Sequence, residues 1–471
     1  MSPAPRILII GAGPTGLGAA SRLVEHGHDN WLLVDSADTP GGLSMSIVDS
    51  AGFTWDLGGH VLFSHYRWFD RLMTKALGDG WMEHEREAWV WIRDRWVPYP
   101  FQNNLWRLPQ PDVAAAVAGL EHVATASHSL PPANFHEWLL RSFGDGLCDI
   151  FMTPYNRKVW AYHPSKMNVS WMGERVATVD LARVKRNIEN RTDDVAWGPN
   201  ATFRFPIRGG TGAIWQSLFD QLPASNVQLS RRVVEVNADA KTVRFADGGV
   251  EAYDALISSM PLDKLIPLIV DRPALHPLAE KFAHSSSHII GVGFEGPVPD
   301  DLKTKCWMYF PDDDCPFYRA TVFSNYSPFN VPTPGHQWSL MAEVSESPDK
   351  PVNLQTVVEE TIQGFRNTRL ISDDTRIVTR WHRRLEHGYP TPWLTRDDVL
   401  SQVEPVLDAA QILSRGRFGT WKYEVSNQDH SAVQGAEAVD HVLLGTAETT
   451  RFGSMNVEPP DLTVHSLRKA K

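Results

Sequence analysis

Apolar and polar positions near the amino terminus predict a strand, a helix and a second strand. The run "RILII" is apolar after its first residue, which is typical of a strand buried in a parallel sheet. The next stretch has helical spacing, with Pro14 suited to a first turn and Gly27 to a C-cap. One face of this helix is apolar, made of Leu17, Ala20, Leu23 and Val24. A second apolar run, "WLLVD", follows and ends at Asp35.

Further along, the period of the apolar positions changes twice. From about residue 107 to 200 it is helical, as in "FHEWLLRSFG" and "VDLARVKRNIEN". Strands return at "RFPIRGG", and "VVEVNADAKTVRFADGG" is typical of a β-hairpin. Runs from "HIIGVGFEG" to "TRIVTRWHR" predict antiparallel strands interrupted by a helix near "LQTVVEETIQGF", and "HSAVQGAEAVDHVLLG" predicts a last helix. We therefore expect domains that are interleaved in the sequence.

Composition narrows the class of protein. The chain has 471 residues, enough for two or three domains, and 45 basic against 56 acidic residues give a formal net charge of -11. This acidity argues against nucleic acid or an anionic membrane as the main partner. Three cysteines without a CxxC pair indicate a reducing compartment and no disulfide framework. The sequence shows no apolar run that could span a bilayer and no signal-peptide pattern, so a cytoplasmic protein is expected.

A glycine pattern lies between the first strand and the first helix. Gly11, Gly13 and Gly16 form GxGxxG, which allows a tight turn, close approach of a pyrophosphate, and packing of helix on strand. The helix N-terminus would face the phosphates, and Asp35 follows at the distance expected for a ribose hydroxyl. Further glycine pairs at 41–42 and 58–59 suit a large cofactor that lies along the backbone. This favours FAD over NAD.

Longer motifs resemble one flavoenzyme family. They extend from about residue 6 to 442 and include "GAGPTGLGAA", "VDSADTPGGLS", "GGHVLFSHY", "FMTPYNRKVWA", "CPFYRATVFSNYSP" and "GRFGTWKYEVSNQDHS". These stretches are similar to UDP-galactopyranose mutases, in particular their eukaryotic-type branch. The resemblance implies an isomerase that interconverts UDP-galactopyranose and UDP-galactofuranose through a covalent adduct on N5 of reduced FAD, without net redox change. It also explains why the sequence shows no Ser/His/Asp triad and no cluster of metal ligands, so no metal is expected.

The resemblance implies roles for individual residues. Arg175 and Arg319 match arginines that hold the diphosphate, and His60 matches a histidine beside the flavin, so these form the expected catalytic set. Arg86 and Arg417 match positions that contact the flavin or its reductant. The expected substrate-binding residues are Phe63, Tyr99, Gln102, Phe151, Asn156, Trp160, Asn200, Tyr309, Tyr326, Tyr423 and Asn427. Of these, Tyr99, Gln102, Phe151, Asn156 and Trp160 match the uridine end of the family's site. The expected cofactor-binding residues are Gly11, Gly13, Thr15, Gly16, Asp35, Ser36, Gly42, Leu43, Gly59, His60, Arg417, Asn427 and Gln428.

For the fold we expect an interleaved α/β flavoprotein of three domains. A Rossmann-like FAD-binding domain would be joined by a helical insertion and by an antiparallel β-sheet domain that carries substrate residues. The expected limits are 1–80, 205–265 and 405–471 for the FAD domain, 105–204 for the helical domain, and 81–104 and 266–404 for the sheet domain.

Two other functions stay open at this point. The same chemistry could act on another nucleotide sugar, because a few loop residues could retune the sugar pocket. An FAD-dependent oxidoreductase of the amine-oxidase-like class would share only the cofactor fold, and it would leave Arg175 and Arg319 without a role. NADH or NADPH is expected as an external reductant in the same cleft, since no second GxGxxG is evident. The sequence does not determine which of the two it is, or whether the chain forms a homo-oligomer.

Overall fold

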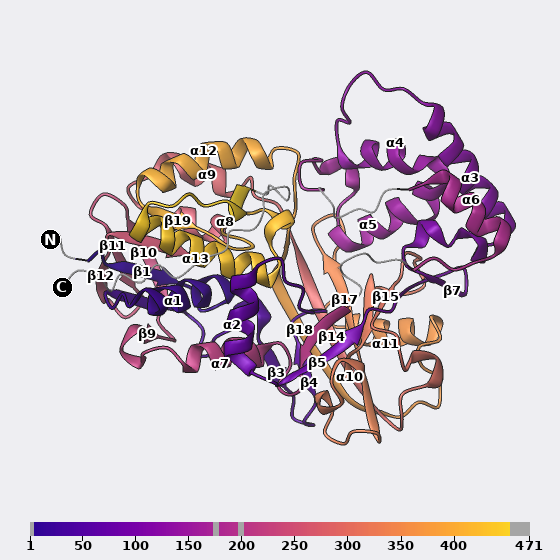
Figure 1. Ribbon diagram of the computed structural model, residues 1–471, viewed down its shortest axis with the longest axis horizontal. Helices are drawn as coiled ribbons and strands as arrows, with labels where there is room; N and C mark the ends of the chain where they lie inside the picture. The colour runs from indigo at the N-terminus through magenta and orange to yellow at the C-terminus, as the bar shows by residue number, and fades with distance from the viewer. Residues whose placement is uncertain (1–3, 173–178, 196–201, 453–471) are drawn as a thin grey trace.

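A five-stranded parallel sheet forms the core of one half of the molecule, at the left of Figure 1. The computed structural model describes residues 4–172, 179–195 and 202–452. The strand order is β19-β13-β1-β2-β9, and every neighbouring pair is parallel. Because the strands come from three distant parts of the chain, this half is interleaved in the sequence as expected. The strands are β1 (Ile7–Ile10), β2 (Trp31–Val34), β9 (Val227–Gln228), β13 (Ala255–Ser258) and β19 (Ile412–Ser414).

Two long helices cover this sheet and pack closely on each other. Helix α1 (Pro14–His26) follows the glycine turn and ends at Gly27, whose φ of 65° is left-handed, as the sequence predicts. Helix α13 (Gln428–Leu444) crosses it where both helices carry glycine. A Cβ on Gly18 would lie 2.3 Å from the Ala432 carbonyl oxygen, so the small residues permit the close approach.

A seven-stranded sheet forms the second half, in the order β18-β14-β17-β16-β15-β6-β7. All pairs are antiparallel, as expected, except β6 with β15, which is parallel. The predicted antiparallel sheet is confirmed apart from this pair, in which β6 comes from a part of the chain far from β15. The strands are β6 (Ala88–Ile92), β7 (Arg95–Pro98), β14 (His284–Glu295), β15 (Trp307–Tyr309), β16 (Arg319–Val322), β17 (Gln337–Glu346) and β18 (Ile377–Pro390).

A helical region covers the β6–β7 end of this sheet, at the upper right of Figure 1. Its helices share one apolar core with the two strands. They are α3 (Gln110–Thr125), α4 (Phe135–Leu147), α5 (Thr153–Trp160) and α6 (Leu181–Asn190). These elements fall inside the predicted helical insertion, whose limits, like those of the other two domains, stay a prediction.

The remaining elements connect and flank the two sheets. The predicted hairpin is confirmed as β10 (Val233–Asn237) and β11 (Thr242–Phe245), joined by β12 (Val250–Ala252). Two further pairs are β3 (Ser46–Val48) with β4 (Thr54–Asp56), and β5 (Trp81–Glu85) with β8 (Thr202–Pro206). The other helices are α2 (Arg67–Leu77), α7 (Gly212–Asp220), α8 (Leu262–Leu265), α9 (His276–Ala279), α10 (Phe323–Tyr326), α11 (Val357–Asn367) and α12 (Arg396–Ala409).

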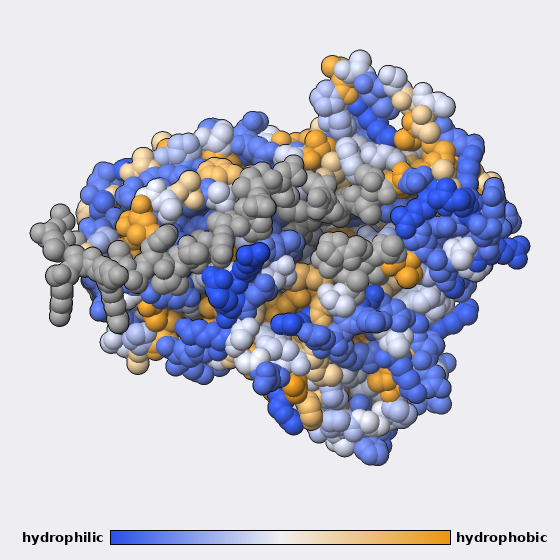
Figure 2. Space-filling view, viewed as in Figure 1, coloured by the Kyte–Doolittle hydropathy of each residue, from blue (hydrophilic) through white to orange (hydrophobic). Residues whose placement is uncertain are grey.

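The described surface is mostly hydrophilic on the face drawn in Figure 2, where apolar residues lie in small separate groups. Across the described residues, no helix combines the length and apolar character that a membrane span requires. Three cysteines, Cys148, Cys306 and Cys315, are buried and reduced.

Candidate active site

A cavity of about 710 Å³ is lined by residues from both halves of the molecule. At one end lie the glycine turn and Asp35. At the other lie side chains from the seven-stranded sheet, together with the segment that follows Gly58. Its volume is within the range of about 300–1,000 Å³ that is typical of ligand sites.

The glycine turn has the geometry that the sequence predicts. Gly11 has a φ of 106°, which favours glycine. A Cβ on Gly16 would lie 1.8 Å from the Gly11 carbonyl oxygen, so this glycine permits the packing of helix on strand. Asp35 accepts hydrogen bonds from the amides of Ala12 (2.6 Å) and Ala37 (2.8 Å). Its carboxylate is therefore fixed at the cavity wall and retains acceptor capacity for a hydroxyl.

This end of the cavity fits a dinucleotide cofactor. Helix α1 begins after Gly13, which has no side chain to cap it, so its first amides are available to a phosphate. Asn427, Gln428 and Ser431, at the start of α13, line the same cavity. At the other end of the cavity, three buried polar atoms of the lining, His60 Nδ1, Trp307 Nε1 and Ser287 Oγ, have no hydrogen-bond partner among the described residues. Such atoms are expected where a bound ligand supplies the partner.

Strand pairing in the seven-stranded sheet places five lining residues side by side at the other end of the cavity. Tyr309 pairs with Arg319, Arg319 with Glu343, Glu343 with Ile289, and Ile289 with Arg383. These five residues form one row across β15, β16, β17, β14 and β18, and all of them line the cavity. Tyr309 and Arg319 lie on consecutive strands, whereas Ile289 and Arg383 come from distant parts of the chain and join the row through sheet pairing.

Arg319 and Glu343 form a buried ion pair in this row. Nε and Nη2 of Arg319 each lie 2.7 Å from a different oxygen of Glu343. Glu343 also accepts from the Tyr318 hydroxyl (2.7 Å) and the Gly59 amide (2.9 Å). Burial opposes both charges, but Glu343 holds the pKa of Arg319 well above its ordinary value and Arg319 holds the pKa of Glu343 below its own. The ion pair uses Nε and Nη2, so Nη1 is the guanidinium nitrogen that can contact a ligand. The expected contact of Arg319 with a diphosphate stays a prediction.

The segment after Gly58 lines the cavity through His60, Val61 and Phe63. Burial and the nearby charge of Arg417 lower the pKa of His60 to about 4. Its imidazole is therefore neutral near pH 7. The guanidinium carbon of Arg86 lies 4.5 Å from the ring centre of Trp307, which places a second cation on this wall.

Aromatic rings connect the predicted uridine-end residues to the cavity. Tyr99 lies 5.3 Å from Tyr309 between ring centres, and Trp160 lies 4.8 Å from Tyr423. Phe151 stacks on Tyr155, which in turn contacts Tyr309. The expected uridine-binding residues are thus packed behind Tyr309 and Tyr423 in this structure.

The structure brings together most of the predicted cofactor residues. Gly16 and Ser36 are the two that do not line the cavity; Ser36 is exposed. Among the predicted substrate-binding residues, those in the lining are Phe63, Tyr309, Tyr423 and Asn427, and Arg319 and His60 of the expected catalytic set line it as well. Those described but outside the lining are Tyr99, Gln102, Phe151, Asn156, Trp160 and Tyr326.

The polar groups of two of these residues already have partners. The Tyr326 hydroxyl donates to the Cys306 carbonyl at 3.3 Å, and the Asn156 amide donates to the Met152 carbonyl at 2.8 Å. Their roles, and those of the other residues outside the lining, stay predictions. Arg175 and Asn200 lie outside the described residues.

Many lining residues were not predicted, and Trp307, Glu343 and Tyr389 are three of them. Trp307 lies two residues before Tyr309 on the same strand, so the period-two alternation places both on one face. That signal could have identified Trp307. Glu343 and Tyr389 have no comparable local signal.

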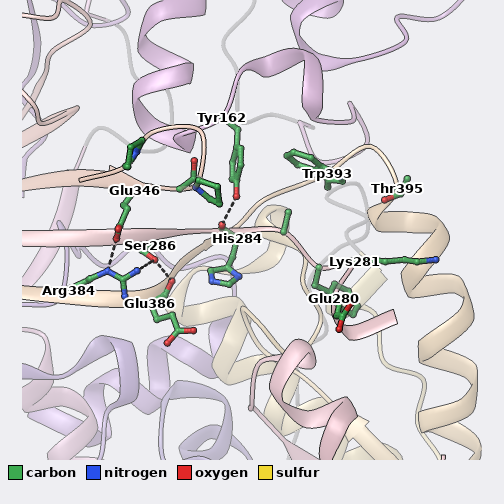
Figure 3. Close-up of a pocket in the computed structure, with 15 residues that line it drawn as sticks. Tyr162, Glu280, Lys281, His284, Ser286, Glu346, Arg384, Glu386, Trp393 and Thr395 are labelled. Carbon is green, nitrogen blue, oxygen red and sulfur yellow. Dashed lines mark hydrogen bonds and ion pairs between the residues drawn. The ribbon is translucent and has the colours of Figure 1, made fainter. Parts of the chain in front are cut away.

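A second cavity of about 760 Å³ lies beside the first and shares Arg384 and Glu386 with it (Figure 3). In its lining, Arg384 Nε donates to Glu346 at 2.5 Å and Nη2 donates to Ser286 Oγ at 3.0 Å. The Tyr162 hydroxyl donates to the His284 carbonyl at 3.2 Å. None of the predicted residues that the structure describes lines it, so the first cavity is the candidate active site.

The comparisons with known proteins show the family of this chain. The model of the flavin containing amine oxidoreductase family matches residues 14–389. A crystal structure of reduced UDP-galactopyranose mutase is 51% identical, with a TM-score of 0.93 and 96% of each chain covered. The chain belongs to the flavin-containing amine oxidoreductases, within the UDP-galactopyranose mutase family. The resemblance inferred from the motifs, and with it the α/β flavoprotein fold, is confirmed.

More distant structures share the fold of this mutase family. A proposed protoporphyrinogen oxidase from Exiguobacterium is 16% identical, with a TM-score of 0.71 and coverage of 94% of this chain and 99% of the other. A fatty acid isomerase from P. acnes that produces CLA is 14% identical, with a TM-score of 0.63 and the same two coverages. At such identities the likeness concerns the fold alone.

Proposed function

We propose that this chain interconverts UDP-galactopyranose and UDP-galactofuranose, using reduced FAD bound in the first cavity. The observation that carries the proposal is the row of Tyr309, Arg319 and Glu343, which faces the same cavity as the glycine turn. The identity of 51% to a UDP-galactopyranose mutase over nearly the whole chain supports it. An oxidoreductase of the amine-oxidase-like class fits less well, because it gives no role to Arg86, Arg319 and Arg417, three of the arginines that line the cavity.

The residues at the glycine end would hold the cofactor. The amides after Gly13 would bind the pyrophosphate, and Asp35 would accept from a ribose hydroxyl. Gln428 and Asn427, at the start of α13, would lie beside the flavin. When bound, reduced FAD supplies a nucleophile for the anomeric carbon of the sugar.

The residues at the sheet end would hold the nucleotide sugar. The free Nη1 of Arg319 and the hydroxyls of Tyr309 and Tyr423 can donate to the diphosphate while it leaves and returns. His60 is neutral near pH 7, so it can pack against the cofactor without adding charge. Arg175 is proposed as a second diphosphate contact from the resemblance alone.

Further parts of the proposal concern partners and location. NADH or NADPH would reduce the flavin from the same cleft, where Arg86 and Arg417 supply positive charge. A cytoplasmic location agrees with three unpaired cysteines. Whether the chain forms a homo-oligomer is left to measurement.

A product assay with UDP-galactofuranose tests the proposal, run on the purified protein with and without a reductant. Conversion to UDP-galactopyranose only with reduced flavin, and without stoichiometric use of reductant, is the expected result. No conversion despite a fully reduced bound flavin would remove the substrate claim and direct the assay to other nucleotide sugars. Stoichiometric consumption of an electron acceptor would favour the oxidoreductase instead.

A further inference from the structure

Residues 59–65, which include His60 and Phe63, are held at both ends by buried carboxylates. At the first end the Gly59 amide donates to Glu343 at 2.9 Å. At the second end the amide and Nδ1 of His65 lie 3.1 and 2.6 Å from Oδ2 of Asp429. The side chains that line the cavity lie between these two attachments. The segment thus connects the seven-stranded sheet to helix α13.

Asp429 does not itself line the cavity, although its neighbours Gln428 and Ser431 do. It is 1% exposed and is the second residue of α13. Its other oxygen accepts from the His430 amide at 2.8 Å. Burial raises the pKa of Asp429, but the imidazoles of His430 and His65 outweigh burial and hold the pKa below its usual value. The residue is therefore a buried anion whose contacts are to histidines.

We propose that Asp429 is a positioning residue, which ties the 59–65 segment to the start of α13 and so sets where His60 and Phe63 stand in the cavity. Residues 59–65 and the first turn of α13, which would both face the flavin, are then held at a constant separation. The effect on catalysis rests on the proposed function, whereas the effect on the segment does not.

Helix α13 offers a matched control in Asp440. This residue is also buried, at 4% exposed, and also contacts an imidazole, His26 Nε2, at 2.6 Å. It pairs with Arg22 at 2.8 Å on helix α1 and does not line the cavity. Asp440→Asn therefore removes a comparable buried charge from the same helix without touching the segment.

The experiment compares Asp429→Asn with Asp440→Asn in the FAD-bound protein. In D429N, we expect faster hydrogen–deuterium exchange in residues 59–65 and an altered absorption spectrum of the bound flavin. The kcat should fall by about ten- to a hundredfold, with a smaller change in KM, because a displacement of about 1 Å near the reacting atoms has effects of that size. In D440N, exchange of the segment, flavin spectrum and kcat should stay as in the wild type, although both variants lose thermal stability.

If D429N fails to fold, two variants of His65, which contacts Asp429, still test the proposal. His65→Asn retains an N–H donor near the position of Nδ1, and His65→Leu does not. We expect H65L to reproduce the effects of D429N and H65N to stay close to the wild type. Equal exchange in H65L and H65N, or in D429N and D440N, overturns the proposal. If the wild type fails to convert UDP-galactofuranose, the proposed function is lost, but exchange and spectrum still decide the role of Asp429.

Discussion

Replacing Arg319 with lysine keeps the positive charge and removes the bidentate hydrogen bond to the carboxylate of Glu343. In the wild type, Nε and Nη2 each donate at 2.7 Å to a different carboxylate oxygen. A lysine ammonium can replace one of these bonds, or contact the diphosphate, but it lacks the planar fork that does both. One charge-assisted hydrogen bond is lost, which is about 1.5–3 kcal/mol. If this loss falls on the transition state, kcat/KM drops by about ten- to a hundredfold.

The assay measures kcat and KM for UDP-galactofuranose under reducing conditions, with FAD content taken from flavin absorbance. FAD content should be unchanged, because Arg319 lies on the sheet wall and not at the glycine turn. Arg396→Lys is the control, since Arg396 donates to both oxygens of Glu424 at 3.0 Å and does not line the cavity. R396K should lose stability with little change in kcat. Wild-type kcat/KM in R319K, or an equal loss in both variants, would refute the reasoning.

Three further predictions follow from the same geometry. Gly16→Ala would place a Cβ 1.8 Å from the Gly11 carbonyl oxygen, so the purified variant should lack bound FAD by absorbance. Glu343→Gln removes the buried carboxylate that compensates the partly buried Arg319, and thermal or urea unfolding should show a loss of about 3 kcal/mol. Burial and the charge of Arg417 lower the pKa of His60 from 6.5 to about 4 in the folded protein. Between pH 6.5 and 4, His60 is therefore protonated in the unfolded chain but neutral in the folded one. Stability falls as pH drops through this window, and the decrease in Tm from pH 7 to 4.5 should be smaller in His60→Asn; an equal decrease would contradict the assignment.

Local chemistry made the cofactor end of the site predictable. Gly11, Gly13 and Gly16 lie within six residues, between a strand and a helix, and such a turn has few alternatives. Gly27 at the end of α1 and Asp35 after β2 followed from the same short-range rules. All of these residues depend on neighbours that are close in sequence. Family motifs extended the prediction to Tyr309 and Arg319, which line the cavity.

The arrangement of the sheet end depends on strand register, which local patterns do not determine. The sequence assigns residues 81–104 and the run that contains β15 to one sheet domain, but it does not show that β6 and β15 pair in parallel across more than two hundred residues. The uridine-end residues show the same limit. Trp160 and Phe151 are expected at the substrate, which stays a prediction; in the structure they contact Tyr423 and Tyr155 and lie outside the cavity lining. An aromatic motif does not say which ring of a cluster faces the cavity.

Glu343 shows most clearly what the sequence could and could not reveal. Strand β17 alternates, with Trp338, Leu340, Ala342 and Val344 on the face that packs into an apolar core. The opposite face carries Ser339, Glu343 and Ser345, which in an isolated sheet would indicate contact with water. All three are nevertheless buried. A buried carboxylate requires a partner, and Arg319 supplies it from the adjacent strand while Gly59 donates from the other half of the molecule. A polar strand face can therefore be the wall of a site. Contacts from distant parts of the chain, such as the Gly59 amide on Glu343 and the Lys158 carbonyl on the Ser345 hydroxyl, distinguish it from a solvent face.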